Sequence, residues 1–310
     1  MLQVLQIVLP VFLVIGIGYF SAHFKFFSVQ QASALMRFAT QFAIPCLLFN
    51  ALVNLDLAKE FRPEILIPFY IGAFASFALV WLGAGVFFKH SPGARVSICF
   101  AGLFSNLVLI GLSIIELAYG VASTKTAIAI IAMHAPFCYI LGITSMEFSR
   151  AGGLGLKATL KAVGKQVFSN TLMLGIMLGF IANLTELSIP APITASLTMI
   201  ASAALPVALF SLGALLVSYK ISSGLGEVGM VSVSKLILHP VIAYVIGSFI
   251  FNLPPEVLKP LVIMAAMPPG MNVYIFADLY DRAKGIAASS VLVSTILSVF
   301  TISIWLVILG

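Results

Sequence analysis

Hydrophobic positions along the chain gather into long runs that contain no Asp, Glu, Lys or Arg. The ten longest runs each contain at least 18 residues, and a membrane-spanning helix needs about 20 predominantly apolar residues. The pattern therefore predicts an all-α polytopic membrane protein with ten transmembrane helices. The predicted spans are residues 1–24, 38–55, 65–88, 96–115, 126–146, 166–185, 187–219, 236–255, 260–277 and 285–310.

The composition agrees with this interpretation. Of the 310 residues, 61% are hydrophobic and 8% are charged, whereas soluble domains contain about 25% charged residues. A water-soluble globular protein is excluded, and so is a disordered chain, which would be polar and highly charged. Because the apolar runs extend from the first residue to the last, we expect no soluble catalytic, sensory or nucleic-acid-binding domain. We expect no signal peptide, because the first span has no basic residue before it and no convincing cleavage site. The expected surroundings are the lipid bilayer.

Basic residues are distributed unevenly between the loops. The loops after odd-numbered spans contain ten Lys and Arg residues, and the loops after even-numbered spans contain four. Cytoplasmic loops are enriched in Lys and Arg, so we expect the odd-numbered loops in the cytoplasm and both termini outside, in the plasma or inner membrane. The ten residues are Lys25, Lys89, Arg95, Arg150, Lys157, Lys161, Lys165, Lys220, Arg282 and Lys284.

The sequence resembles itself at an offset of 161 residues. An odd number of spans in each copy would turn the second copy upside down, and such inverted repeats are typical of secondary transporters. We therefore predict a first five-span repeat over 1–149 and a second over 166–310, joined by a basic cytoplasmic linker over 150–165. The offset aligns Gly18 with Gly179, Ala43-Ile44-Pro45 with Ala204-Leu205-Pro206, and Tyr119 with Tyr280.

Two spans contain residues that interrupt a helix. Pro268, Pro269 and Gly270 lie within the ninth span, and proline removes a backbone donor and clashes with the preceding turn. The fourth span has Asn106 and Gly111 but no proline. If both helices break, two helix N-termini converge near the midplane, an arrangement suited to a carboxylate. The alternative is a kinked packing helix with a buried asparagine bonded to backbone.

Ionisable residues within spans are candidates for function because burying them is costly. Lys235 and His239 are four residues apart and share one helix face, where they could sense an anion or carry a coupling proton. Alternatively, Lys235 snorkels to the interface. For His134 a satisfied core histidine is favoured over a proton carrier. Glu116 and Asp278 are either protonation sites or caps of loop ends.

Four segments, in order along the chain, resemble motifs of the auxin efflux carrier family, which includes plant PIN-type carriers and shorter prokaryotic relatives. The family belongs to the bile, arsenite and riboflavin transporter superfamily. The similarity extends over essentially the whole chain. The segments are Phe38–Phe49, Asn106–Ser113 with Ala118-Tyr119-Gly120, Ala208–Gly213, and Met267–Gly270 with Val273–Ala277 and Tyr280.

The resemblance implies a scaffold part (spans 1, 2, 6 and 7) and a mobile transport part (spans 3–5 and 8–10). It also implies crossing broken helices 4 and 9, a carboxylate substrate, an elevator mechanism and a homodimer. Two positions depart from the family pattern, because Ser113 and Val273 stand where prolines are usual. The substrate-binding residues carried over are Ser105, Asn106, Gly111, Ser113, Pro268, Pro269, Gly270, Asn272 and Tyr274, with Pro45 and Pro206 on the wall past which the site moves.

The leading hypothesis is a carrier that exports or exchanges a small organic anion, either auxin-like or a mono- or dicarboxylate. The alternative is a sodium- or proton-coupled symporter resembling the bile-acid symporters, for which Thr40, Ser105 and Asn272 offer oxygen ligands. No hydrolase, metalloprotease or prenyl-diphosphate motif is present, so an enzyme is not expected. The three cysteines lack metal-ligand spacing, and we expect no metal or cofactor. A channel or sensor is disfavoured because pore-lining charge rings are missing.

Overall fold

The computed structural model describes residues 2–149, 155–219 and 224–310. Regular secondary structure in these residues is entirely helical. The chain forms two compact units, and each unit draws on both sequential halves. Arg150, Lys220 and the first part of the expected 150–165 linker lie outside the described residues.

Seven of the described helices are long and apolar enough to cross a membrane. Two of them begin nine or more residues earlier than the sequence runs indicated, at Val29 rather than 38 and at Leu225 rather than 236. The predicted starts were wrong because Arg37 and Lys235 were taken as boundaries, although a charged side chain does not end a helix. The seven are Val4–His23, Val29–Val53, Pro63–Val86, Val121–Ser149, Ala191–Leu216, Leu225–Ile250 and Lys284–Leu309.

Further apolar segments are divided into shorter helices. Lys157–Phe168 and Thr171–Leu184 meet at an angle of 79° and count as an eighth span if they are taken together. The fourth and ninth apolar runs are each split into two helices that are too short to cross alone. The structure thus contains seven to eight spans by length and composition, as a polytopic membrane protein requires.

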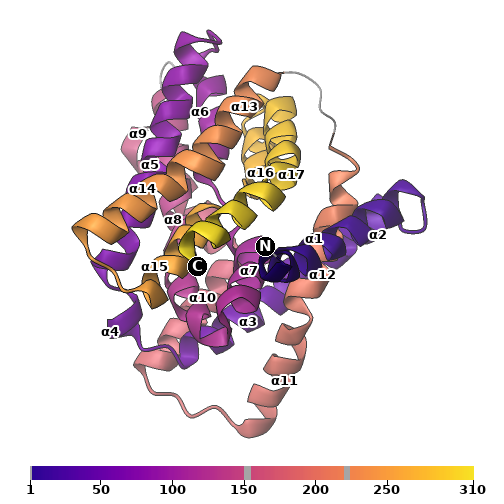
Figure 1. Cartoon of the computed structure of the whole chain (residues 1–310), viewed down its shortest axis with the longest axis vertical. Helices are drawn as coiled ribbons and strands as arrows, with labels where there is room; N and C mark the ends of the chain where they lie inside the picture. The colour runs from indigo at the N-terminus through magenta and orange to yellow at the C-terminus, as the bar shows by residue number, and fades with distance from the viewer. Residues whose placement is uncertain (1, 150–154, 220–223) are drawn as a thin grey trace. The chain divides into compact units, whose positions relative to one another are not determined.

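Unit 1 comprises the start of the chain up to Val8, Arg62–Gly164 and Tyr219–Gly310. Its elements are the α-helices labelled in Figure 1 and four short π- or 3-10-helical segments, designated η. They are α5 (Pro63–Val86), α6 (Pro92–Leu103), η2 (Leu107–Gly111), α7 (Leu112–Tyr119), η3 (Val121–Ser123), α8 (Thr124–Ser149), α9 (Gly155–Phe168, shared with unit 2), α13 (Leu225–Val233), η4 (Ser234–Leu238), α14 (His239–Val245), η5 (Ile246–Ile250), α15 (Pro255–Ala265), α16 (Asn272–Leu279) and α17 (Lys284–Leu309).

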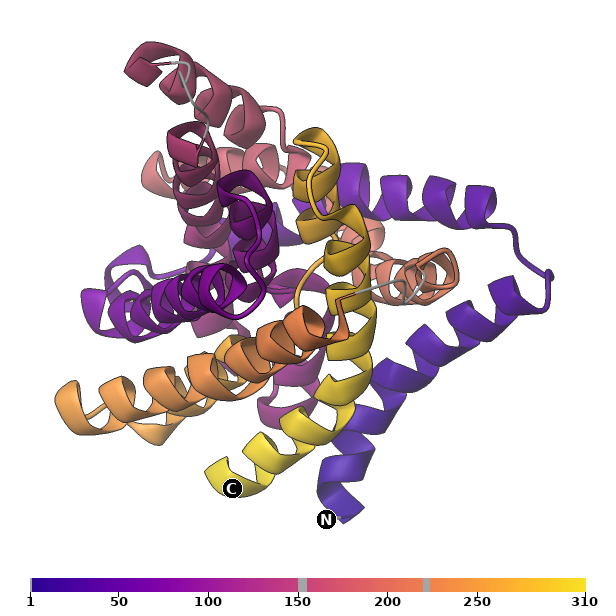
Figure 2. The ribbon, with the colours of Figure 1, turned by 90° about the horizontal axis from the view of Figure 1, so that it is seen from above.

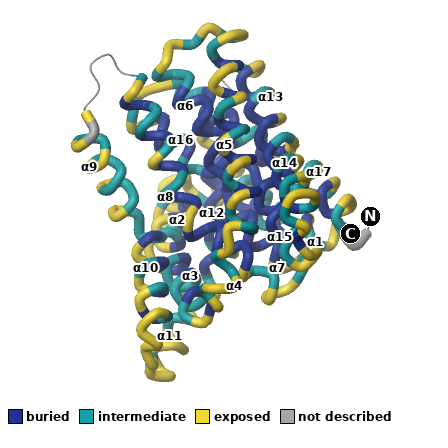
Figure 3. Tube along the Cα trace, turned by 90° about the vertical axis from the view of Figure 1, so that its left-hand side faces the viewer, coloured by how far each residue is buried: buried dark blue, intermediate teal, exposed yellow. Residues whose placement is uncertain are grey.

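The core of unit 1 is built around α6 and α8. Every residue of α6 from Val96 to Leu103 is buried, and buried positions continue along α8 (Figure 3). Phe100 on α6 stacks on Phe276 on α16 with ring centroids 3.9 Å apart. The long helix α17 runs beside α13 (Figures 1 and 2). Segments distant in sequence are therefore packed tightly within this unit.

Unit 2 comprises Leu9–Phe61 and Lys165–Ser218. Its helix α11 contains no buried residue and is drawn largely in yellow (Figure 3). The elements of this unit are most of α1 (Leu2–His23), α2 (Val29–Phe38), η1 (Ala39–Ala43), α3 (Ile44–Val53), α4 (Leu57–Glu60), α10 (Thr171–Leu184), α11 (Ala191–Ser202) and α12 (Ala204–Leu216).

Glycines allow close helix packing in unit 2. A Cβ added to Gly18 on α1 would overlap the Phe210 carbonyl of α12, and one added to Gly213 on α12 would overlap the Ile15 carbonyl of α1. Glycine permits such backbone approach, as small residues do at membrane helix interfaces. These contacts fix α1 against α12.

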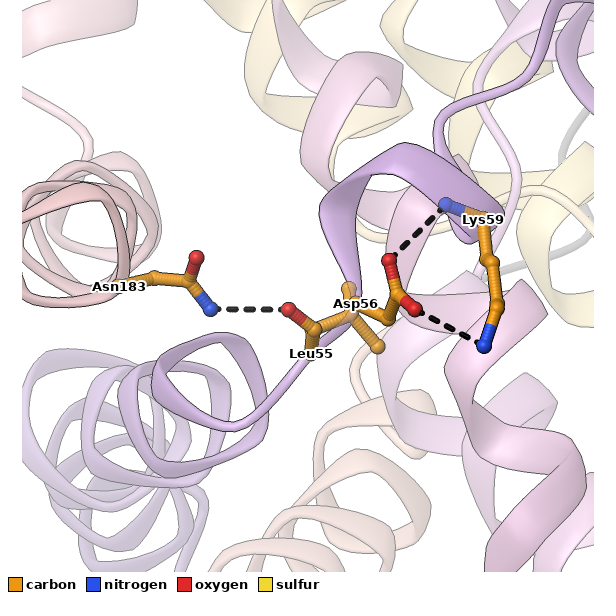
Figure 4. Close-up of polar contacts among 4 residues, drawn as sticks. All are labelled: Leu55, Asp56, Lys59 and Asn183. Atoms are coloured by element: carbon orange, nitrogen blue, oxygen red, sulfur yellow. Dashed lines mark hydrogen bonds and ion pairs between the residues drawn. The ribbon is translucent and has the colours of Figure 1, made fainter. Parts of the chain in front are cut away.

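The end of α3 is held by a side chain of α10. Asn183 Nδ2 donates to the carbonyls of Leu52, Val53 and Leu55 at 2.9 Å each. Figure 4 shows the bond to Leu55, next to the Asp56 carboxylate, which accepts from the amide and the ammonium of Lys59. Carbonyls at a helix C-terminus have no partner within the helix. Asn183 provides a donor for the Val53 and Leu55 carbonyls and adds a bond to the Leu52 carbonyl, which also accepts the Leu55 amide.

We predict that Gly213→Ala lowers the free energy of unfolding by about 1–3 kcal/mol, because the added methyl group forces α1 and α12 apart. Gly16→Ala is the matched control, since a Cβ at Gly16 meets no atom within 4 Å. Thermal unfolding of both variants in detergent checks the prediction. Equal stability of Gly213→Ala and Gly16→Ala would contradict it.

Candidate functional site

The fourth and ninth apolar segments both break, and the breaks pair with each other within unit 1. Helix α6 ends at Leu103 and η2 begins at Leu107, while α15 ends at Ala265 and α16 begins at Asn272. The intervening residues form an antiparallel bridge between Ser105 and Pro269. The Asn106 amide donates to the Pro268 carbonyl at 2.8 Å, and the Gly270 amide donates to the Phe104 carbonyl at 3.1 Å. We call this pairing the crossover.

Several hydrogen-bond donors next to the crossover have no partner among the residues that the structure describes. They include the amides of Met271 and Asn272 and the amides that open η2 at residues 107–110. Ser105 is 2% exposed, and its Oγ has no partner. Asn106 is also buried, at 6% exposed. Unsatisfied buried donors are costly, so this group of donors suits an acceptor ligand.

His134 on α8 holds one strand of the crossover. Its Nε2 accepts the Ser105 amide at 3.0 Å, so the proton of the neutral ring is on Nδ1. Its ring also packs edge-on against Phe104, with centroids 4.9 Å apart. His134 is a buried, hydrogen-bonded core histidine, as the sequence analysis predicted. Its contact with the fourth span could not be read from the sequence, which showed only a histidine midway along the fifth span.

Lys235 and His239 form a buried pair beside the crossover. Lys235 Nζ donates to the Leu103 carbonyl at 3.2 Å and lies 2.9 Å from His239 Nδ1. His239 Nε2 lies 2.9 Å from the Phe69 carbonyl of α5. Both residues are 0% exposed. The snorkelling interpretation of Lys235 was wrong because its helix begins ten residues earlier, at Leu225, which places the side chain inside unit 1.

Two of the other predicted binding residues have structural partners. A Cβ at Gly111 would lie 2.8 Å from Met264 Sδ, so glycine allows η2 to approach α15. The Ser113 hydroxyl donates to the Leu109 carbonyl at 2.8 Å. The Ser113 hydroxyl therefore already donates within its own helix and is not an unpaired donor for a ligand.

The aromatic and acidic candidates lie farther along the chain. Tyr274 packs against Tyr219 with ring centroids 5.3 Å apart. Asp278 is exposed, and its carboxylate bonds Lys284 Nζ at 2.7 Å, which ties the end of α16 to the start of α17. Glu116 is also exposed.

The two predicted wall residues, Pro45 and Pro206, belong to unit 2, whereas the crossover lies in unit 1. Pro45 packs against α10, where a Cβ on Gly175 would lie 2.5 Å from the Pro45 carbonyl oxygen. In the described part of the chain no group of three or more His, Cys, Asp and Glu could hold a metal ion.

We predict that His134→Leu destabilises the protein by about 1–3 kcal/mol, because it leaves the buried Ser105 amide without an acceptor. His134→Gln retains a side-chain carbonyl and is expected to restore part of the loss. Thermal unfolding of the two variants in detergent measures the difference. If the leucine variant is as stable as the glutamine variant, the bond does not support the crossover.

Comparisons with known proteins agree with this architecture. The model of the membrane transport protein family matches residues 3–306. A putative malonate transporter of Rhizobium meliloti is 26% identical over 98% of this chain and 95% of its own length. Uncharacterized transporter YfdV of Escherichia coli K12 is 25% identical over 96% of this chain and 95% of its own length. Probable auxin efflux carrier component 5c of Oryza sativa is 20% identical over 97% of this chain and 95% of its own length. The chain is therefore a membrane transporter that belongs to the auxin efflux carrier family.

Proposed function

We propose that the chain is a secondary carrier that exports or exchanges a small organic anion, with the carboxylate bound at the crossover. The observation that carries the proposal is the group of unpaired donors on both sides of the Ser105–Pro269 bridge. Relatives named as a putative malonate transporter and as auxin efflux carriers support a carboxylate substrate. A dicarboxylate of the size of malonate is the first candidate.

The chemistry of the site favours a carboxylate over a neutral ligand. A carboxylate only accepts hydrogen bonds. The site offers it donors of three kinds: the side-chain amide of Asn106, the hydroxyl of Ser105, and the backbone amides of Met271 and Asn272. The starts of η2 and α16 both carry the positive end of a helix dipole. Hydrogen bonds to an ionised group are about twice as strong as neutral ones, so the two broken helices together discriminate in favour of an anion. Tyr274, Pro268, Pro269 and Gly270 shape the same site.

We propose ten crossings in two inverted repeats. Seven long helices and the bent pair α9–α10 supply eight, and α6 with α7 and α15 with α16 supply two broken crossings. The glycine contacts support the repeat. Gly18 faces the Phe210 carbonyl, and Gly179 lies against Phe49 with a Cβ position 3.2 Å from its carbonyl oxygen. The offset of 161 residues exchanges these two pairs, which is the relation that an inverted repeat requires.

The proposed motion is of the elevator type. Unit 1 contains the crossover and the predicted spans 3–5 and 8–10, and unit 2 contains most of span 1 and spans 2, 6 and 7. We assign unit 1 as the mobile transport part and unit 2 as the scaffold, with Pro45 and Pro206 on its wall. The assembly is proposed to be a homodimer in the plasma or inner membrane, with both termini outside.

The decisive test is substrate-evoked current from purified protein in liposomes on a solid-supported membrane. The panel consists of malonate, oxalate and indole-3-acetate, with and without sodium and pH gradients. We expect a saturable current, and its ion dependence separates uniport from sodium- or proton-coupled symport. Absence of current from every anion, together with no uptake of radiolabelled malonate by the same liposomes, would contradict the proposed function if the protein is folded.

Asn106→Ala is expected to raise the half-saturating malonate concentration about 10- to 100-fold, because it removes a hydrogen bond to a charged group that is worth about 1.5–3 kcal/mol. Asn54→Ala is the matched control, since Asn54 donates to the Asn50 carbonyl at 3.4 Å within unit 2. The same current assay measures both variants. Unchanged half-saturation in a folded Asn106→Ala protein would remove Asn106 from the site.

A further inference from the structure

Lys235 is a basic residue that the described residues do not pair with a carboxylate. It is 0% exposed, and its two polar contacts are the Leu103 carbonyl and His239 Nδ1. A buried charge is costly unless an opposite charge or sufficient hydrogen bonds compensate it. The protonation of this side chain therefore depends on what else occupies its surroundings.

The hydrogen bonds match a neutral amine better than an ammonium. His239 Nε2 faces the Phe69 carbonyl, which only accepts, so Nε2 carries the ring proton and Nδ1 accepts from Lys235. A neutral amine has two N–H groups, and both have acceptors here. An ammonium has a third N–H and a positive charge. Among the described residues there is no acceptor for the third N–H and no carboxylate beside the charge.

The neighbouring helices pack closely around Lys235 and His239. A Cβ on Gly72 of α5 would lie 2.6 Å from His239 Cδ2. Lys235 lies in the π-helical turn η4, and Pro240 cannot donate to the Leu236 carbonyl. Trp305 Nε1 donates to that carbonyl instead, at 3.3 Å. Wide turns of this kind occur frequently at functional sites.

Neighbouring titratable groups do not supply a countercharge. His134 is neutral because Nε2 accepts the Ser105 amide, and the Tyr70 hydroxyl donates to the Ile130 carbonyl at 2.8 Å. Cys99 and Cys138 are buried thiols. The charged residues on the packed helices α5, α6, α8, α13, α15 and α17 all lie among the first five or the last three residues of their helix. They are Glu64, Arg95, Lys125, Glu147, Glu227, Glu256, Lys259 and Lys284.

The crossover is close enough for an anion there to act on Lys235. Leu103, whose carbonyl Lys235 bonds, is three residues from Asn106, so their Cα atoms are at most about 11 Å apart. Opposite unit charges about 11 Å apart, with an effective dielectric constant of about 20, change a binding constant by about tenfold, and a larger separation weakens their interaction energy in inverse proportion. A carboxylate at Asn106 and a proton on Lys235 therefore favour each other's binding.

We propose that Lys235 takes up a proton when a carboxylate binds at the crossover, so that anion and proton are carried together. The proton comes from the aqueous phase and adds to the Nζ lone pair, and the carboxylate supplies the countercharge. His239 is a positioning residue that holds the amine at the Leu103 carbonyl. The inference rests on the proposed function and names its coupling ion.

The experiment measures proton uptake by purified protein in weakly buffered detergent solution with a pH-sensitive dye, on addition of fully ionised malonate. We expect uptake approaching one proton per malonate bound, and none on addition of malonamide, the neutral analogue. Malonate affinity, measured by calorimetry, is expected to fall as the pH rises, by up to tenfold per unit, because binding and protonation are linked.

Lys235→Met keeps the length of the side chain and removes the amine. We expect it to abolish proton uptake, flatten the pH profile and lower malonate affinity about tenfold. Lys259→Met is the control, because Lys259 lies on α15 and bonds the Gly310 carbonyl. This variant should retain proton uptake, the pH profile and the malonate affinity of the wild-type protein.

The outcomes separate the two proposals. Malonate binding by the wild-type protein without proton uptake overturns the coupling inference and leaves the carrier function standing. Proton uptake that persists in Lys235→Met moves the coupling site away from Lys235 and overturns the assignment. No binding of any anion by folded wild-type protein overturns the carrier function itself. The wild-type stoichiometry decides the coupling even if Lys235→Met does not fold.

Discussion

The need to satisfy backbone hydrogen bonds where no water is available governs this structure. Within a bilayer, irregular backbone survives only where protein or a cavity receives its polar groups. The segments at Phe104–Asn106 and Pro268–Gly270 meet this requirement by bonding to each other. Because each break satisfies the other, neither is stable alone, and the surrounding helices must bring both to the same place. His134 and Lys235 add the bonds that the two segments cannot provide, at Ser105 and Leu103.

The crossover is also where the protein leaves donors unpaired. A packed interior normally satisfies more than nine in ten of its buried backbone groups, so the unpaired amides beside a buried hydroxyl support the ligand site that we propose here. The same region is flanked by a lysine with no acidic partner in the described chain. Unpaired donors beside a buried amine are the basis of the preference for anions that we propose for this site.

Much of the fold followed from the sequence, and the exceptions have physical causes. Apolar runs predicted the membrane helices, and Pro268 and Pro269 predicted a break, because both are local properties. Helix starts at Val29 and Leu225 were missed, since a charged residue within a helix is tolerated when its side chain finds a partner or an exposed face. The roles of His134 and Lys235 depend on contacts with Ser105 and Leu103, which no local pattern contains. The break in the fourth span, which lacks proline, was suggested by Asn106 and is completed by its partner strand.

The π-helical turn at Ser234–Leu238 carries a consequence for how sequences of this kind diverge. Such a turn holds one residue more than an α-helical turn, and each residue advances an α-helix by about 100°. Loss of a single residue from Ser234–Leu238 would restore regular winding and leave the helix on either side in register, because the wide turn absorbs the extra residue. Only residues within the turn, Lys235 among them, would change direction. A change of one residue in the length of this stretch therefore alters the direction of the buried lysine while the flanking helix keeps its packing.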